Sequence, residues 1–252
     1  MLRALTRAVS PAIESCELTH LQRTPIDYER AAAQHAAYEE ALVRAGCEIV
    51  AVEPLDDLPD GVFVEDTAVV LDDVAILTRP GAESRVPEVE SVASVLVRWR
   101  PLERIEAPGT LDGGDVLRLG NRLFVGSSAR TNAEGIRQLA ERAGIEVVAV
   151  PLNDALHLKT AATALDDETV LVQPRWVDPA HFAGARVVEV DPSEPFAANT
   201  LRVGDTLIVP AAHPRTAERC APFVPRIDLV AADELAKAEG GVTCCSIILE
   251  TA

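Results

Sequence analysis

The residue best placed to do chemistry is Cys244, a cysteine eight residues from the C-terminus. It follows Gly240-Gly241, and glycine gives the backbone a freedom that could present the thiol in a pocket. A buried cysteine in an apolar strand is more often a small hydrophobic residue without chemistry. A nucleophilic role for Cys244 therefore requires a base and an electrophile elsewhere in the chain.

The neighbouring Cys245 competes for the same role. We expect a strand over residues 244–249, in which successive side chains point to opposite faces. Cys244 would then share its face with Ser246, whereas Cys245 would share the apolar face of Ile247 and Leu249. This alternation favours Cys244 as the nucleophile and Cys245 as a core residue.

His157, between Leu156 and Leu158, could supply the base. A histidine between two leucines is usually a satisfied core residue, so this role requires that the fold bring it to the thiol. Because the histidine precedes the cysteine in the chain, a papain-like peptidase is disfavoured.

Acidic residues gather at the ends of two apolar runs, in residues 60–66 and 112–115. Acids often flank turns, but Glu65 and Asp66 interrupt an otherwise apolar stretch. Burying an unpaired carboxylate is costly, so a cationic partner is expected. A guanidinium group fits, since a thiolate can attack its carbon while its nitrogens donate paired hydrogen bonds to carboxylates. No metal-binding or phosphate-binding motif is present in the sequence.

The composition narrows the class of ligand. A formal net charge of −17 over 252 residues disfavours nucleic acid and anionic membranes as partners and favours a small cationic molecule. Five cysteines suit neither a disulfide framework nor a paired zinc site. We found no secretory signal and no stretch of about 18 apolar residues, so the sequence predicts a soluble cytoplasmic protein.

A repeated order of elements would position these residues: strand, turn, strand, helix, strand. Four copies are expected between residues 67 and 230, with a Pro-interrupted segment in place of a helix in the third. The predicted strands are 68–71, 74–78, 104–107, 116–119, 123–126, 145–150, 161–165, 169–173, 187–190, 201–203, 206–209 and 227–230, and the predicted helices are 87–98, 132–143 and 215–223.

The two ends of the chain complete a fifth unit: strand 2–9 would pair with strand 244–249, followed by helix 28–45 and strand 48–52. Five units closing on themselves predict one α/β domain over residues 1–252, a ring with several small cores and a central site. The alternative is an ordinary α+β domain whose hairpins merely resemble one another.

The motifs taken together resemble the dimethylarginine dimethylaminohydrolase family of the guanidino-group-modifying superfamily, over nearly the whole chain and in the same order. The residues that carry the resemblance are Phe63-Val64-Glu65-Asp66, Thr78-Arg79-Pro80-Gly81-Ala82 with Arg85, Thr110-Leu111-Asp112-Gly113-Gly114-Asp115-Val116, Phe124-Val125-Gly126 with Arg130-Thr131-Asn132, Leu156-His157-Leu158-Lys159, Ala197-Ala198-Asn199 and Thr243-Cys244-Cys245-Ser246. The resemblance implies a five-bladed α/β propeller of ββαβ units.

The resemblance also implies roles for individual residues. Cys244 would be the nucleophile, His157 the general acid and base, and Asp112 the acid that orients His157. The implied substrate-binding residues are Leu18 in a mobile covering loop, Asp66 as the guanidinium partner with Glu65 and Asp60 in the same group, and Arg85 and Arg130 on the α-carboxylate.

The implied reaction is thiolate addition to the guanidinium carbon with loss of methylamine or dimethylamine, followed by hydrolysis of a covalent thiouronium to citrulline. It needs no cofactor and no metal. Because an acidic protein raises the pKa of a thiol, we expect Cys244 to be a thiol in the free protein and to ionise when the cationic substrate binds.

Three other functions stay open. An arginine deiminase uses similar chemistry on unmethylated arginine, but its chains are usually longer and carry a helical insertion. A non-catalytic guanidine-binding protein would be favoured if the nucleophile, base or acid were substituted, and all three are present. An amidinotransferase would require an amine acceptor. The sequence leaves open the preference among methylated and unmethylated arginines, and the oligomeric state, a homodimer included.

Overall fold

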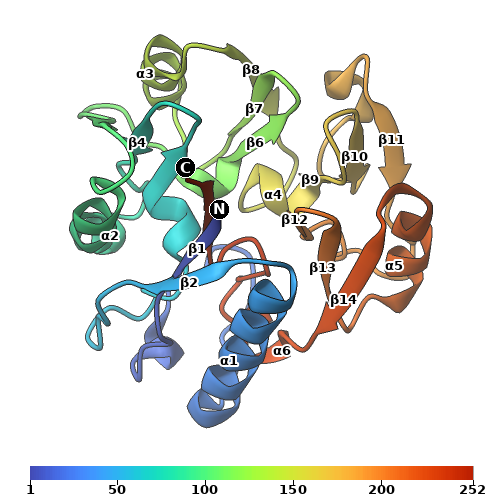
Figure 1. Cartoon of the computed structure of the whole chain (residues 1–252), viewed down its shortest axis with the longest axis horizontal. Coiled ribbons are helices and arrows are strands. Elements are labelled where there is room, and N and C mark those ends of the chain that lie inside the picture. Colours follow the sequence, from blue (N-terminus) through green and yellow to red (C-terminus); the bar gives the residue numbers. More distant parts are fainter. Residues whose placement is uncertain (252) are drawn as a thin grey trace.

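In the computed structural model, which describes residues 1–251, five three-stranded sheets are arranged around a central axis (Figure 1). In every sheet the middle strand pairs antiparallel with one neighbour and parallel with the other. A parallel pair needs a crossover connection, which lies on the outside of the ring. The chain is a five-bladed α/β propeller, as predicted.

The first sheet joins the two ends of the chain. Strand β1 (Leu2–Thr6) lies between β15 (Ile247–Glu250), which is antiparallel to it, and β2 (Glu48–Ala51), which is parallel. Helix α1 (Tyr28–Arg44) makes the crossover from β1 to β2 (Figure 1). The predicted pairing of the terminal strands is therefore confirmed, and it closes the ring.

The other four sheets follow in chain order. They are β3 (Ala68–Val70), β4 (Ala75–Leu77) and β5 (Leu102–Arg104); β6 (Val116–Leu119), β7 (Arg122–Ser127) and β8 (Glu146–Pro151); β9 (Ala162–Ala164), β10 (Thr169–Val172) and β11 (Arg186–Glu189); and β12 (Leu201–Val203), β13 (Thr206–Pro210) and β14 (Arg226–Val230).

Helices occupy three of these four crossovers: α2 (Val89–Leu96), α3 (Ala133–Ala143) and α5 (Pro214–Cys220). The crossover of the β9–β11 sheet instead contains the 3-10 helix η5 (Pro179–Phe182), where a Pro-interrupted segment was predicted. The remaining short helices are α4 (Leu158–Ala161), α6 (Asp233–Ala236), η1 (Ile13–Ser15), η2 (Val64–Thr67), η3 (Glu83–Glu88), η4 (Gly113–Asp115) and η6 (Ala221–Phe223).

Each core is shared by two adjacent sheets, which is what holds the blades in a ring. One such core joins Leu5 and Ile247 of the first sheet to Leu77 of the second and to Leu96 of α2. Another joins Phe124 of β7 to Val170 of β10. Because every blade buries its apolar side chains against its neighbours, the inner ends of the blades are fixed relative to one another.

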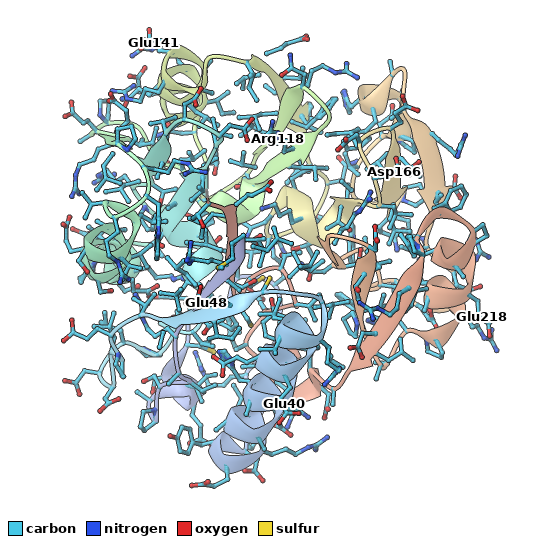
Figure 2. All side chains as sticks on the ribbon, in the orientation of Figure 1. Glu40, Glu48, Arg118, Glu141, Asp166 and Glu218 are labelled. Carbon is cyan, nitrogen blue, oxygen red and sulfur yellow. The ribbon has the colours of Figure 1, made fainter. Side chains whose placement is uncertain are left out.

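The outer surface is strongly acidic. Glu40, Glu141 and Glu218 are exposed on the outward faces of α1, α3 and α5 (Figure 2). Among residues 1–251, no helix is long and apolar enough to cross a membrane.

Three predicted elements differ from the observed ones, one near the C-terminus and two in the second blade. Cys244 and Cys245 lie in a turn and the strand begins only at Ile247, because the carbonyl of Cys244 accepts the backbone N–H of Glu65 (3.1 Å) rather than that of a neighbouring strand. The predicted helix 87–98 begins as the 3-10 helix η3, and the predicted strand 104–107 lies at residues 102–104, where β4 is available to pair with it.

Helix α3 offers a test of the local signals. The side chain of Asn132 caps its N-terminus by accepting the backbone N–H of Gly135 (2.8 Å), and Gly144 ends it with a φ of 66°. We predict that Asn132→Ala lowers the free energy of unfolding by about 1–2 kcal/mol, because the N–H of Gly135 loses its acceptor. Urea unfolding measures the change. Asn132→Asp is the control: it keeps the acceptor and loses only the exposed hydrogen bond from Nδ2 to the carbonyl of Pro108 (2.9 Å), so it should lose less stability than the alanine variant. Wild-type stability of the alanine variant would contradict the assignment of the cap.

Candidate active site

A small cavity lies at one end of the propeller axis, where loops from several blades meet. Its volume is about 20 Å³, which is room for one water molecule. The residues that line it are Glu17, Asp60, Phe63, Asp66, Arg85, Arg130, Leu156, His157, Ala238, Glu239, Gly240 and Cys244. They come from segments far apart in the sequence, so the ring of blades creates the site.

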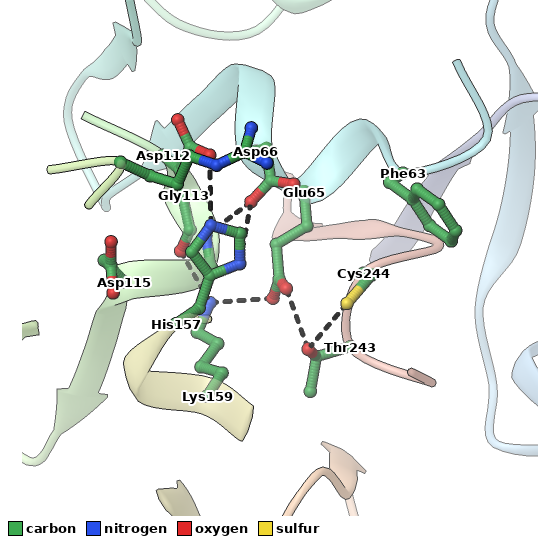
Figure 3. Close-up of polar contacts among 12 residues, drawn as sticks. Phe63, Glu65, Asp66, Asp112, Gly113, Asp115, His157, Lys159, Thr243 and Cys244 are labelled. Carbon is green, nitrogen blue, oxygen red and sulfur yellow. Dashed lines mark hydrogen bonds and ion pairs between the residues drawn. The ribbon is translucent and has the colours of Figure 1, made fainter. Parts of the chain in front are cut away.

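His157 lies buried between two carboxylates. It directly precedes α4, its Nε2 is 3.0 Å from Oδ2 of Asp112, and its Nδ1 is 3.8 Å from Oδ1 of Asp66 (Figure 3). Burial alone would lower the pKa of His157, but the charges of Asp66 and Asp115 and the hydrogen bond to Asp112 raise it to about 9. At neutral pH the ring is therefore an imidazolium, with a proton on each nitrogen.

A glycine pair makes this close approach of His157 and Asp66 feasible. A Cβ on Gly114 would lie 2.6 Å from Nδ1 of His157 and 2.8 Å from Oδ1 of Asp66, whose carboxylate accepts the N–H of Gly114 (2.9 Å). A Cβ on Gly113 would overlap the carbonyl oxygen of Glu65. The absence of side chains at these glycines therefore leaves room for His157, Asp66 and the backbone of Glu65.

Arg85 is fully buried and already engaged by two acids. Its Nη1 is 2.5 Å from Oδ2 of Asp66, and Glu88 accepts from its Nε (3.2 Å) and Nη2 (2.8 Å). Burial opposes the charge of Arg85, but Glu88 and Asp66 hold its pKa well above the usual value. Burial also works against the carboxylate of Asp66, yet His157 and Arg85 lower its pKa. A substrate carboxylate at Arg85 would have to share the guanidinium with these acids.

Arg130 is the freer of the two arginines. Its Nη2 donates to Oγ1 of Thr19 (2.9 Å), and within residues 1–251 no carboxylate lies within 4 Å of its guanidinium. The backbone N–H of Arg130 is fixed by Oγ of Ser128 (3.0 Å), which in turn donates to Asp115 (2.6 Å). Asp115 also accepts the N–H of Leu158 (2.9 Å), so one buried carboxylate ties the loop of Arg130 to the helix that follows His157.

The N-terminal loop that contains Leu18 covers the cavity. The N–H of Glu17 donates to Oδ2 of Asp60 (3.0 Å), while Leu18 is half-buried against the hydrophobic core that includes Phe63 and Val242. The carboxylate of Glu239 accepts three successive backbone N–H groups, from Thr19 (2.9 Å), His20 (2.6 Å) and Leu21 (2.6 Å). With the loop in this position the cavity is too small for an amino acid.

Cys244 faces this cavity and is half-buried. Its Sγ accepts the N–H of Gly241 (3.3 Å) and is 3.9 Å from Oγ1 of Thr243. Burial first, and then the negative charges of Glu65 and Asp66, raise the pKa of Cys244 to about 12. The residue is therefore a thiol at neutral pH, in agreement with the expectation from the acidic sequence. Cys245 is 2% exposed and belongs to the core, also as expected.

Glu65 is connected to the thiol through Thr243 and pairs with Lys159. Its Oε1 is 2.7 Å from Nζ of Lys159 and its Oε2 accepts the hydroxyl of Thr243 (2.7 Å), as Figure 3 shows. Burial raises the pKa of Glu65, and the charge of Lys159 opposes that effect.

The glycines before Cys244 serve a purpose different from the predicted flexibility. A Cβ on Gly240 would overlap the ring of Phe63, and one on Gly241 would overlap the side chain of Asn199. Neither glycine has a positive φ. Close packing, rather than conformational freedom, requires glycine at both positions.

Comparison with known proteins identifies the family. A family model described as arginine deiminase matches residues 52–201. N(G),N(G)-dimethylarginine dimethylaminohydrolase of Streptomyces coelicolor is 44% identical over 98% of this chain and 96% of its own length, and that of Pseudomonas aeruginosa is 40% identical over 88% of this chain and 89% of its own. The chain belongs to the dimethylarginine dimethylaminohydrolase family.

Two solved structures of family members share the fold. The P. aeruginosa protein, as a cysteine-to-serine mutant complexed with citrulline, superposes with a TM-score of 0.94 at 36% identity and covers 99% of this chain and 100% of its own. A histidine-to-glycine dimethylarginine dimethylaminohydrolase in an adduct with S-methyl-L-thiocitrulline has a TM-score of 0.92 at 36% identity, with the same coverage.

The structure brings eight of the nine site residues named from the sequence to one place. Six of them line the cavity, namely Asp60, Asp66, Arg85, Arg130, His157 and Cys244. The other two lie directly behind it: Asp112 is hydrogen-bonded to His157, and Glu65 is joined through Thr243 to Cys244. The ninth, Leu18, is in the loop that closes over them. Asp66, Asp112 and His157 also place ligand atoms within 4.8 Å of one another, but a protonated histidine and the adjacent Arg85 disfavour a cation there.

Sequence reasoning missed several residues that connect this group, namely Glu88, Asp115, Lys159, Asn199, Thr243 and Glu239. Glu88 is three residues after Arg85, and this spacing on a helix is typical of an ordinary surface ion pair. For two of the others the sequence offered only their position next to a named residue. Thr243 precedes the nucleophile candidate, and Lys159 follows His157 by two residues.

The raised pKa of His157 predicts a pH-dependent contribution to stability. Because the folded pKa is about 9 and the unfolded value about 6.5, the contribution is fully present below about pH 6.5 and is lost as the pH rises through about 9. The difference in unfolding free energy between the wild type and His157→Gln should therefore shrink by about 3 kcal/mol over that range. Denaturant unfolding at several pH values measures it, with the exposed-histidine variant His20→Gln as the matched control; a difference independent of pH would contradict the imidazolium.

Proposed function

We propose that this single-domain protein hydrolyses Nω,Nω-dimethylarginine or Nω-monomethylarginine to citrulline and dimethylamine or methylamine. One observation carries the proposal: a thiol, an imidazolium held by carboxylates, and an arginine without a carboxylate partner face one small covered cavity. The same activity is the one for which the relatives in S. coelicolor and P. aeruginosa are named.

Binding would use complementary charges at the two ends of the substrate. Asp66, with Asp112 and Glu65 near it, would hold the guanidinium, while Arg130 would bind the α-carboxylate and Asp60 the α-amino group. Arg85 would assist at the carboxylate end only by sharing its bonds to Asp66 and Glu88. The loop that contains Leu18 would open for entry and close over the bound molecule, excluding water.

In the first half of the reaction the sulfur of Cys244 would attack the guanidinium carbon. A C–S bond forms, the bond from carbon to the methylated nitrogen breaks, and the imidazolium of His157 gives its proton to the departing amine. The raised pKa of His157 suits this step, because the ring already carries the proton that the leaving group needs. A cationic thiouronium stays on the enzyme.

In the second half the now neutral His157 would take a proton from a water molecule as the water oxygen adds to the same carbon. Collapse of this adduct breaks the C–S bond with the sulfur leaving as a thiolate, forms the urea carbonyl of citrulline, and releases the second water proton to solvent. A relative bound to citrulline and another that forms an adduct with S-methyl-L-thiocitrulline are in keeping with this sequence of steps.

The arginine deiminase description of the matching family model favours one second candidate, hydrolysis of unmethylated arginine. The two activities differ only in the leaving amine, which is ammonia for arginine. The protein would act on free small molecules in either case, and its five unpaired cysteines favour a reducing compartment such as the cytoplasm.

The proposed function predicts that the purified protein forms citrulline from dimethylarginine. Cys244→Ser should lose activity by a factor on the order of 10⁴ or more, because the nucleophile is removed. Cys245→Ser, the matched control one residue away, should keep most of the activity. Citrulline release from dimethylarginine, monomethylarginine and arginine is the measurement; preference for arginine would favour the second candidate.

Two results would contradict the proposal. If folded protein forms no citrulline from any of the three compounds, the proposed reaction is wrong. An active Cys244→Ser together with an inactive Cys245→Ser would remove the assignment of the nucleophile.

A further inference from the structure

The proposed reaction leaves one proton unaccounted for. Cys244 is a thiol in the free protein, and it must lose its proton before its sulfur can attack the substrate. The nearby His157 is already protonated and must remain so, because it later gives its proton to the leaving amine. Some other group has to accept the thiol proton, and with the loop closed the cavity holds little water.

Thr243 is the group that connects the thiol to another acceptor. Its Oγ1 is 3.9 Å from Sγ of Cys244 and 2.7 Å from Oε2 of the buried Glu65. Figure 3 shows the Thr243 hydroxyl joined on one side to Cys244 and on the other to Glu65, which is in turn joined to Lys159. The chain of contacts thus leads from the reacting sulfur to a carboxylate that does not itself line the substrate cavity.

Asn199 fixes the direction of these hydrogen bonds. Its Oδ1 accepts the backbone N–H of Thr243 (3.1 Å), so its Nδ2 must be the atom that donates to Oγ1 of Thr243 (3.0 Å). A hydroxyl has one proton and two lone pairs, and the carboxylate of Glu65 can only accept. The proton of Thr243 therefore points at Glu65, and a lone pair of Oγ1 is left to accept the S–H of Cys244.

We propose that, when the cationic substrate binds, Thr243 passes the thiol proton of Cys244 to Glu65. This inference rests on the proposed function. The S–H bond breaks as an O–H bond forms on Thr243, and the original hydroxyl proton of Thr243 moves to Oε2 of Glu65, which becomes a neutral acid. When Cys244 leaves the substrate carbon in the second half of the reaction, the same two transfers run in reverse. No electrons are exchanged, and no further reactant is needed.

The surroundings of Glu65 suit a carboxylate that gains and loses a proton. Burial raises the pKa of Glu65, and Lys159 keeps its Oε1 in place while Oε2 faces Thr243. A second cavity of about 240 Å³ is lined by Glu65, Lys159 and Thr243 together with residues of β3, β6, β9, β12 and β15. No residue of the covering loop lines this second cavity, so water in it can reach Glu65 while the loop covers the substrate cavity.

The test compares Thr243→Val, which removes the hydroxyl at nearly constant volume, with Thr243→Ser, which keeps it. With dimethylarginine at neutral pH, kcat of the valine variant should fall by about 10²-fold, whereas the serine variant should stay close to the wild type. The valine variant should also gain rate about tenfold for each pH unit, because hydroxide must then take the thiol proton. The wild type should show no such rise below the pKa of His157.

Glu65→Gln provides a second arm, since the amide cannot accept the proton, and it should show the same rise of rate with pH. It also decides the question if Thr243→Val does not fold, as judged by thermal unfolding. The relay would be overturned if Thr243→Val kept the wild-type rate and pH profile. It would also be overturned if the valine and serine variants lost kcat equally without a change in the pH profile. Either result with an active wild type leaves the proposed function standing, whereas an inactive wild type removes that function instead.

Discussion

The structure depends on the pairing of buried acids with buried cations at the centre of the ring. Asp66 pairs with Arg85 and His157, Asp112 with His157, and Glu65 with Lys159. A buried charge without a partner is expensive, so these acids and cations stabilise one another in the interior. The absence of a side chain at Gly114 lets His157 and Asp66 approach each other.

This network sets two opposite protonation states side by side. The surplus of carboxylates raises the pKa of His157 to about 9. Burial first, and then these carboxylates, raise the pKa of Cys244 to about 12, so the free protein holds an imidazolium and a neutral thiol. The thiol is consequently a poor nucleophile until a cation arrives. A guanidinium supplies the missing positive charge next to the acids, which lowers the cost of the thiolate. The site is thus activated by the charge of the molecule on which it would act.

Local signals were enough to predict the blades, because each hairpin and crossover is marked by alternating apolar residues and turn residues close in the sequence, as in Val116–Leu119. The errors arose where distant residues intervene. The predicted strand does not extend before Ile247, because the carbonyl of Cys244 accepts the N–H of Glu65 instead. The need for glycine at positions 240 and 241 is explained only by the positions of Phe63 and Asn199. The roles of the site residues came from the family resemblance, and the connecting residues, Glu88 and Thr243 among them, became visible only in the structure.

Burial and the neighbouring acids should together keep Cys244 a neutral thiol in the substrate-free protein. Ultraviolet absorbance of the thiolate, measured against pH for the wild type and for Cys244→Ser, isolates this one residue. The account predicts that the difference between the two proteins shows no thiolate below about pH 10, consistent with a pKa of about 12. A thiolate assigned to Cys244 at neutral pH would contradict it.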